Sequence, residues 1–133
     1  MRALIIDDSR AIRAMIGRFV KELGFEVVEA GNGQEGLDRL GAPGHIDIAL
    51  VDWNMPVMSG IEFVHAVRTR PEFAPMRILM VTTEAETAAV QRALTEGANE
   101  YLMKPFTKEG LRDRLEMLGV VPPPHAAAAS ASP

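Results

Sequence analysis

The sequence of 133 residues contains no cysteine, which excludes a disulfide framework, a thiolate zinc site and a cysteine nucleophile. No apolar stretch approaches the roughly 18 consecutive residues that a membrane-spanning helix requires. The apolar run near the N-terminus, residues 3–6, is shorter than the run of about 7–15 in a secretory signal. Positive charge is also scarce, because 14 lysines and arginines face 18 aspartates and glutamates, a net charge of −4 that does not favour nucleic-acid binding. We therefore expect a cytoplasmic protein that neither inserts into a membrane nor binds nucleic acid.

Five short apolar runs recur along the chain, at residues 3–6, 27–28, 46–51, 78–81 and 101–103. Runs without strict alternation of apolar and polar residues are typical of strands buried on both faces of a parallel sheet. Helical patterns separate the runs, so the order is strand then helix, repeated five times. Right-handed crossovers then place helices on both faces of one sheet. The sequence therefore predicts an α/β fold with a doubly wound, five-stranded parallel sheet.

The first helical pattern is the clearest. Apolar residues recur with helical spacing over residues 12–23, and Gly24 is a natural stop signal. We interpret the basic residues of this helix, Arg10, Arg13 and Arg18, as a solvated face.

The four later helices carry recognisable start signals. Side chains that can accept hydrogen bonds from free backbone N–H groups precede each of them. These signals are Asn32, Thr107 and the capping boxes that pair Ser59 with Glu62 and Thr83 with Glu86.

Polar side chains follow four of the predicted strands at the point where each strand ends. Asp7 and Asp8 follow the first strand and Asp52 ends the third. Thr82 and Lys104 end the fourth and the fifth. Ligands of open α/β sheets bind beyond the carboxyl ends of the strands, so we expect these five side chains to converge on one edge.

Three clustered carboxylates repel one another unless a cation lies between them. Mg²⁺ suits such a cluster, because it prefers a few carboxylates and keeps several waters. A hard cation beside a carboxylate, a hydroxyl and a lysine can neutralise a transferring phosphoryl group. The carboxylate itself can act as the nucleophile and form an aspartyl phosphate.

The motifs that surround these residues identify a family. The sequence resembles the receiver domain of two-component response regulators, and among them the CheY-like single-domain type. The matching stretches are residues 5–9 (IIDDS), 21–25 (KELGF), 51–56 (VDWNMP) with Ser59 and Gly60, 80–82 (MVT) and 104–107 (KPFT).

The resemblance implies the flavodoxin-like strand order 2-1-3-4-5. It also implies a receiver domain over residues 1–119. Residues 120–133 are rich in proline and alanine and are expected to be a disordered tail. Because this leaves no room for a DNA-binding output domain, we expect the output to be a contact with a protein.

Roles at the sheet edge follow from the resemblance residue by residue. Asp52 is expected to be the phosphoacceptor. Mg²⁺ would be held by the carboxylates of Asp8 and Asp52, by Asp7 mainly through water, and by the backbone carbonyl of Asn54. Lys104 would pair with the phosphoryl oxygens.

The resemblance also implies a switch. Thr82 would hydrogen-bond the phosphoryl group, and the side chain of Tyr101 would follow Thr82. The bond from Lys104 to Pro105 is a candidate cis peptide. Thr83 departs from the family, which usually has a smaller residue there. A larger side chain could narrow the access of water or a partner to the phosphate, so the resemblance does not predict the rate of phosphate hydrolysis.

The expected function is that of a phosphoacceptor in two-component signal transduction. A sensor histidine kinase would be the donor, and the face made by helix 4, strand 5 and helix 5 would bind a downstream target protein. The chain would not be a turnover enzyme, because it would catalyse only its own phosphorylation and dephosphorylation. A chemotaxis-type output and a phosphorelay shuttle of the same fold both stay open, as does a phosphatase partner.

Two other classes are weighed against this interpretation. Residues 31–36 read G-x-G-x-x-G, and Asp52 follows about 20 residues later, as in dinucleotide-binding folds. However, this motif follows the second strand, and we interpret its glycines as turn formers. A haloacid-dehalogenase-like phosphatase would require a second acid two residues after the nucleophile, where this chain has Asn54.

Overall fold

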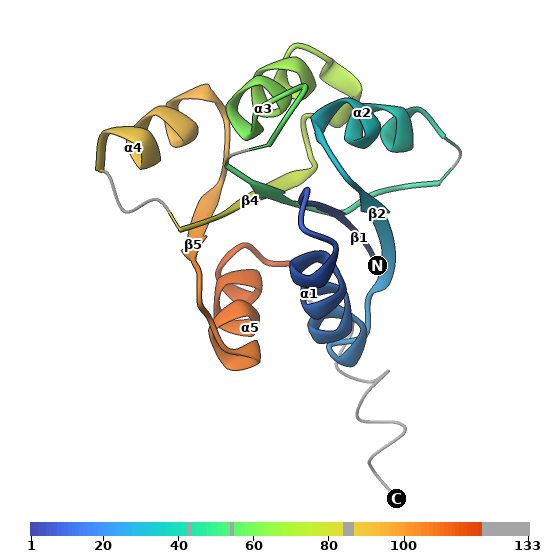
Figure 1. The fold of residues 1–133 in the computed structure, drawn as a ribbon. Helices are drawn as coiled ribbons and strands as arrows, with labels where there is room; N and C mark the ends of the chain where they lie inside the picture. The colour runs from blue at the N-terminus through green and yellow to red at the C-terminus, as the bar shows by residue number, and fades with distance from the viewer. Residues whose placement is uncertain (43, 54, 84–86, 121–133) are drawn as a thin grey trace, which may run out of the picture.

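Five parallel strands form one twisted sheet in the order β2-β1-β3-β4-β5 (Figure 1). Their bounds are β1 (Arg2–Ile6), β2 (Glu26–Ala30), β3 (Ile48–Asp52), β4 (Arg77–Thr82) and β5 (Glu100–Met103). The computed structural model describes residues 1–42, 44–53, 55–83 and 87–120. The predicted α/β class, the parallel sheet and the strand order are confirmed.

Helices cover both faces of the sheet, as predicted (Figure 1). One face carries α1 (Arg10–Glu22) and α5 (Lys108–Met117). The other carries α2 (Gly33–Gly41), α3 (Gly60–Arg68) and α4 (Thr87–Glu96), with the short 3₁₀ turn η1 (Pro71–Phe73) after α3.

The sheet therefore separates two apolar cores. Along β1, Leu4 and Ile6 pack with the helices α2 and α3, whereas Ala3 and Ile5 pack on the side of α1 and α5. All four side chains are fully buried. This burial on both faces explains why β1, like β3 and β4, reads as a nearly continuous apolar run.

The helix ends agree with three of the predicted start signals. Asn32 accepts a hydrogen bond from the third residue of α2, Thr107 does the same for α5, and Ser59 forms a reciprocal capping box with Glu62 at α3. The predicted box at Thr83 includes residues 84–86, which lie outside the described residues.

The end of the chain is described as far as residue 120, so nearly all of the predicted tail lies outside the described residues. No helix in the described ranges is long and apolar enough to cross a membrane.

Gly60, the first residue of α3, lies against the end of β3. Its N–H donates to the carbonyl of Trp53, and a Cβ added here would lie 2.4 Å from the Asp52 carbonyl oxygen and 2.8 Å from the Met80 Cε. A backbone oxygen cannot move aside as the end of a flexible side chain can. The close approach of α3 to the end of β3 therefore requires glycine at this position.

We expect Gly60→Ala to lower the free energy of unfolding by about 1–3 kcal/mol, because the added methyl group overpacks this contact. The measurement is urea denaturation followed by circular dichroism. Gly41→Ala is the matched control, since an added Cβ meets nothing within 4 Å at the end of α2. This control should leave stability unchanged or raise it by up to about 1 kcal/mol. Equal stability of the two variants would contradict the packing explanation.

Candidate functional site

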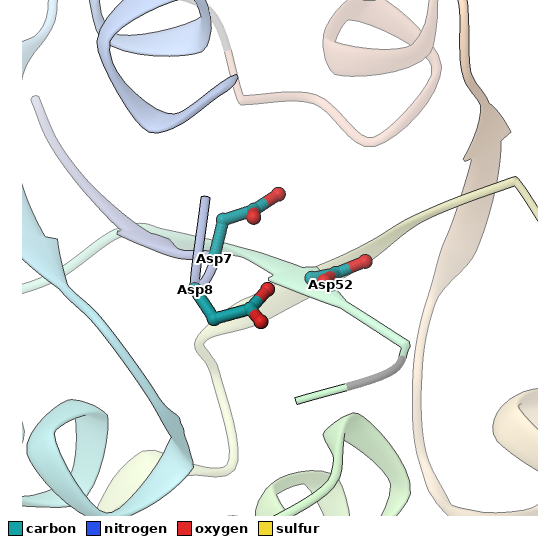
Figure 2. A group of neighbouring side chains, drawn as sticks. All are labelled: Asp7, Asp8 and Asp52. Atoms are coloured by element: carbon teal, nitrogen blue, oxygen red, sulfur yellow. The ribbon is translucent and has the colours of Figure 1, made fainter. Parts of the chain in front are cut away.

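Three carboxylates meet at the carboxyl end of the sheet (Figure 2). Asp7 and Asp8 follow β1, Asp52 is the last residue of the neighbouring strand β3, and one oxygen of each lies within 4.8 Å of the others. Asp7 and Asp52 are buried, whereas Asp8 is exposed. The predicted convergence of these aspartates is therefore present in the structure.

Lys104, which follows the edge strand β5, brings an ammonium group into the same cluster. Its bond to Pro105 is cis, as the resemblance implies. The Nζ atom lies 3.0 Å from Asp7 Oδ2 and 3.3 Å from Asp52 Oδ1. The lysine side chain is only 15% exposed, so this ion pair is largely shielded from solvent.

Burial and neighbouring charges change the acidity of Asp52 and Lys104. Burial and the negative charge of Asp7 raise the pKa of Asp52 above its ordinary value, although Lys104 acts in the opposite direction. Burial alone would lower the pKa of Lys104, but its hydrogen bond to Asp7 and the charges of Asp52 and Asp7 raise it instead. The two shifts are compatible, because the ammonium is attracted by two carboxylates while Asp52 is desolvated and repelled by its neighbours.

The carboxylate of Asp7 is fixed by two partners. Its Oδ1 accepts a hydrogen bond of 2.8 Å from the Ser9 N–H, and its Oδ2 accepts the bond from Lys104. By contrast, the Asp8 carboxylate has no hydrogen bond or ion pair within the described residues. Asp8 is thus the acid whose oxygens are most available to a new ligand.

The composition of the cluster fits a hard divalent cation. When all groups are ionised, three carboxylates face one ammonium, which leaves two negative charges in excess. Carboxylate oxygen is the donor that Mg²⁺ prefers, and a cation here would relieve the repulsion. The predicted backbone ligand, Asn54, lies outside the described residues.

The fourth strand contributes a hydroxyl to this edge. Thr82 ends β4 and is buried, and its carbonyl accepts a hydrogen bond from the Lys104 N–H at 2.8 Å. The next residue, Thr83, is exposed.

Tyr101 lies on β5, one strand beyond Thr82. Its ring is half-buried against the core, and the guanidinium of Arg114 lies 6.0 Å from the ring centroid. The cation therefore faces the aromatic ring from α5. The switch role of Tyr101 stays a prediction.

The glycine motif at residues 31–36 has a packing role. Gly33 and Gly36 lie in α2, and a Cβ on Gly36 would lie 2.5 Å from Ile6 Cδ1, while one on Gly33 would lie 2.8 Å from Met58 Cγ. None of the three motif glycines has a positive φ angle. Our interpretation of these glycines as turn formers is therefore wrong for Gly33 and Gly36, which allow α2 to approach β1 and the loop before α3.

The interpretation of the α1 arginines as a solvated face is also wrong for one of them. The Arg13 side chain is 17% exposed, and its Nη1 donates to the Asp7 carbonyl oxygen at 2.6 Å. Arg10 and Arg18 are exposed. Helical spacing alone cannot identify this contact, because the position of Arg13 relative to Asp7 depends on the turn between β1 and α1.

Comparison with known proteins agrees with this geometry. The sequence pattern of the response regulator receiver domain family matches residues 3–116. The chain is 40% identical over 119 residues to the chemotaxis protein CheY1 of Helicobacter pylori, covering 89% of this chain and 96% of that protein. A chemotaxis protein CheY homolog of Campylobacter jejuni is 41% identical over 117 residues, which is 87% of this chain and 90% of that one. The structure of Vibrio cholerae CheY4 superposes with a TM-score of 0.83 at 38% identity, covering 88% of this chain and 97% of that chain.

Proposed function

Because the chain belongs to the response regulator receiver domain family, we propose that it accepts a phosphoryl group on Asp52 from a histidine kinase. The observation that carries this proposal is the pairing of Asp52 with the Lys104 ammonium inside a cluster of three carboxylates. This arrangement puts a nucleophile and a fixed positive charge at one edge of the sheet.

Asp52 is the nucleophile. One of its carboxylate oxygens forms a bond to phosphorus while the bond from phosphorus to the donor's imidazole nitrogen breaks, and the electron pair leaves with that nitrogen. The nucleophile is ionised, so no general base has to remove a proton. Burial raises the pKa of Asp52, and a more basic carboxylate is a better nucleophile.

Lys104 and Thr82 stabilise the charge on the phosphoryl oxygens. The Lys104 ammonium already lies 3.3 Å from Asp52 Oδ1, so it is in place before the phosphoryl group arrives. A preorganised cation of this kind needs little rearrangement during the reaction. The Thr82 hydroxyl donates a hydrogen bond to the phosphorylated aspartate, and Tyr101 follows its movement.

Asp8 and Asp52 would hold Mg²⁺ directly, with Asp7 acting mainly through water and the Asn54 carbonyl as a further ligand. When bound, the cation neutralises phosphoryl oxygens and the excess negative charge of the cluster. Asp7 meanwhile holds Lys104 through its Oδ2 atom.

The output is a phosphorylation-dependent contact with a target protein, of the chemotaxis type that the names of the relatives indicate. We place this contact on α4, β5 and α5. Among the described residues, large exposed apolar side chains lie on each of these elements, namely Leu94, Met103 and Met117. A charge change at Asp52 can bias this face through Thr82 and Tyr101.

The remaining properties are proposed on the same basis. Residues 1–119 form the receiver domain, and residues 120–133 form a tail rich in proline and alanine. The protein acts in the cytoplasm. It catalyses its own phosphorylation and dephosphorylation and no other turnover.

The test is incubation of the purified chain with acetyl phosphate and Mg²⁺, followed by intact mass spectrometry and peptide mapping. We expect one phosphoryl group, located on the peptide that contains Asp52. Removal of divalent cations with EDTA should prevent its formation, because the carboxylate cluster then keeps its excess negative charge. Absence of an adduct in the presence of Mg²⁺ would refute the proposal.

A further inference from the structure

Arg13 is the one residue of the α1 basic face that reaches the carboxylate cluster. It lies in the first turns of α1, and its guanidinium makes two directed contacts. Nη1 donates to the Asp7 carbonyl oxygen at 2.6 Å, and Nε donates to Glu29 Oε1 at 2.9 Å. Both bonds use the planar geometry of the guanidinium, which a lysine cannot reproduce.

The Asp7 carbonyl belongs to the peptide unit that leads into Asp8. The other polar groups of Asp7 are already held, since its N–H donates to the Ala30 carbonyl at 3.2 Å and its carboxylate binds the Ser9 N–H and Lys104. The bond from Arg13 therefore fixes the last free group of Asp7. It also fixes the plane of the peptide from which Asp8 continues.

Asp8 depends on this peptide for its position. Its exposed carboxylate has no hydrogen bond or ion pair within the described part of the chain. Backbone placement is thus what keeps an Asp8 oxygen within 4.8 Å of the other two carboxylates.

Glu29 orients the guanidinium group of Arg13 by accepting its Nε–H. It lies in the edge strand β2, next to β1, where it is paired in register with Ile5. Its carbonyl accepts a hydrogen bond of 3.1 Å from Arg39 Nε of α2, which anchors the end of β2. Arg13 therefore connects the turn after β1 to a strand that is itself held by a helix.

We propose that Arg13 is a positioning residue for Mg²⁺, holding the peptide between Asp7 and Asp8 so that Asp8 stays within reach of Asp52. This inference rests on the proposed function, because it concerns the affinity of the same site. It also predicts a change in Mg²⁺ affinity that is opposite in direction to the one expected from charge alone. Coulomb's law alone predicts that loss of a nearby positive charge tightens the binding of a cation, whereas loss of a positioning contact weakens it.

The experiment is a Mg²⁺ titration at constant ionic strength, followed by the fluorescence of Trp53, the single tryptophan, which is adjacent to Asp52. We expect Arg13→Gln to bind Mg²⁺ roughly tenfold more weakly than the wild type, as for other partners that hold metal ligands. Arg13→Lys retains the charge but loses the paired contacts, and it should also bind more weakly. Arg10→Gln is the matched control, because it removes an exposed charge from the same helix, and it should bind as tightly as the wild type or more tightly.

Urea denaturation without metal shows whether each variant is folded. Glu29→Ala leaves Arg13 in place and removes only the carboxylate that accepts from its Nε, so it tests the orientation of Arg13 if Arg13→Gln is unfolded, and it should also weaken Mg²⁺ binding. Unchanged or tighter binding by Arg13→Lys and Arg13→Gln would overturn the positioning role while leaving the proposed function intact. A wild type that shows no Mg²⁺ response would overturn the metal site itself, and the positioning role with it.

Discussion

Replacing Asp52 with asparagine should abolish the phosphoadduct that acetyl phosphate and Mg²⁺ form on the wild type. Asparagine has nearly the shape of aspartate but lacks the anionic oxygen that attacks phosphorus. Lys104 keeps its partner Asp7 at 3.0 Å in this variant, so the surrounding structure should persist. The measurement is intact mass under the labelling conditions described above.

The control for this variant is Asp38→Asn, which removes an exposed carboxylate on α2 that does not belong to the cluster. It should be labelled like the wild type. An undiminished adduct on Asp52→Asn would show that another residue is the acceptor.

Asp52→Asn should also change how the stability of the metal-free protein depends on pH. Because the pKa of Asp52 lies above its ordinary value of 3.8, the folded protein loses stability as the pH rises through that pKa and the buried group becomes charged. Asparagine has no charge to gain. The variant should therefore have a higher Tm than the wild type at pH 7. The difference should shrink as the pH falls through the raised pKa toward 3.8, because the folded protein then holds Asp52 in its neutral form. A lower Tm at pH 7 would show that the attraction to Lys104 outweighs burial and repulsion.

Replacing Lys104 with methionine should have a large effect of a different kind. Removal of one member of a buried ion pair leaves uncompensated charge, and such changes cost roughly 3–5 kcal/mol. The variant leaves Asp7 and Asp52 without their shared cation, so the loss of stability should be greatest in metal-free buffer. Added Mg²⁺ should restore more of the Tm than it adds to the wild type, because the cation then neutralises the extra charge.

The rate of phosphorylation should fall by about 10²-fold in the Lys104 variant, the scale found when one preorganised donor to a developing charge is removed. Asp52 is still present, so a slow adduct should form. Lys108→Met serves as the control, because Lys108 is a partly exposed lysine paired with Glu22 at 3.2 Å. Unchanged rate and stability in Lys104→Met would contradict the role of the ion pair.

The fold and the edge that carries the site could be predicted because their signals are local. The strands β1, β3 and β4 are buried on both faces and must be almost wholly apolar, so each is visible as a run, whereas the partly buried edge strands β2 and β5 give shorter runs. A side chain that ends a parallel strand must lie at the carboxyl edge of the sheet. Asp7, Asp52 and Lys104 are examples. The order of the strands came from the family resemblance, because alternation of strands and helices does not determine it.

The contacts that were missed depend on how elements sit against one another. Arg13 has the spacing of a solvated residue, but the turn after Asp8 brings α1 close enough for its guanidinium to reach the Asp7 carbonyl. Gly36 belongs to a phosphate-binding pattern in sequence, yet its neighbour is Ile6 from β1. Both contacts depend on how closely a helix packs against the sheet in the folded protein. The spacing of apolar residues in the sequence does not contain this information.

The ion pairs of Lys104 have a consequence for the protein during its synthesis on the ribosome. Asp7 and Asp52 precede their lysine by 97 and 52 residues, and the strand before Lys104 lies at the edge of the sheet, paired only with β4. A nascent chain that has left the ribosome as far as β4 therefore carries Asp7 and Asp52, the proposed phosphoacceptor, without the Lys104 ammonium. β5 is synthesised after the other four strands of this sheet, so the carboxylate cluster receives its lysine only after the rest of the sheet has been made.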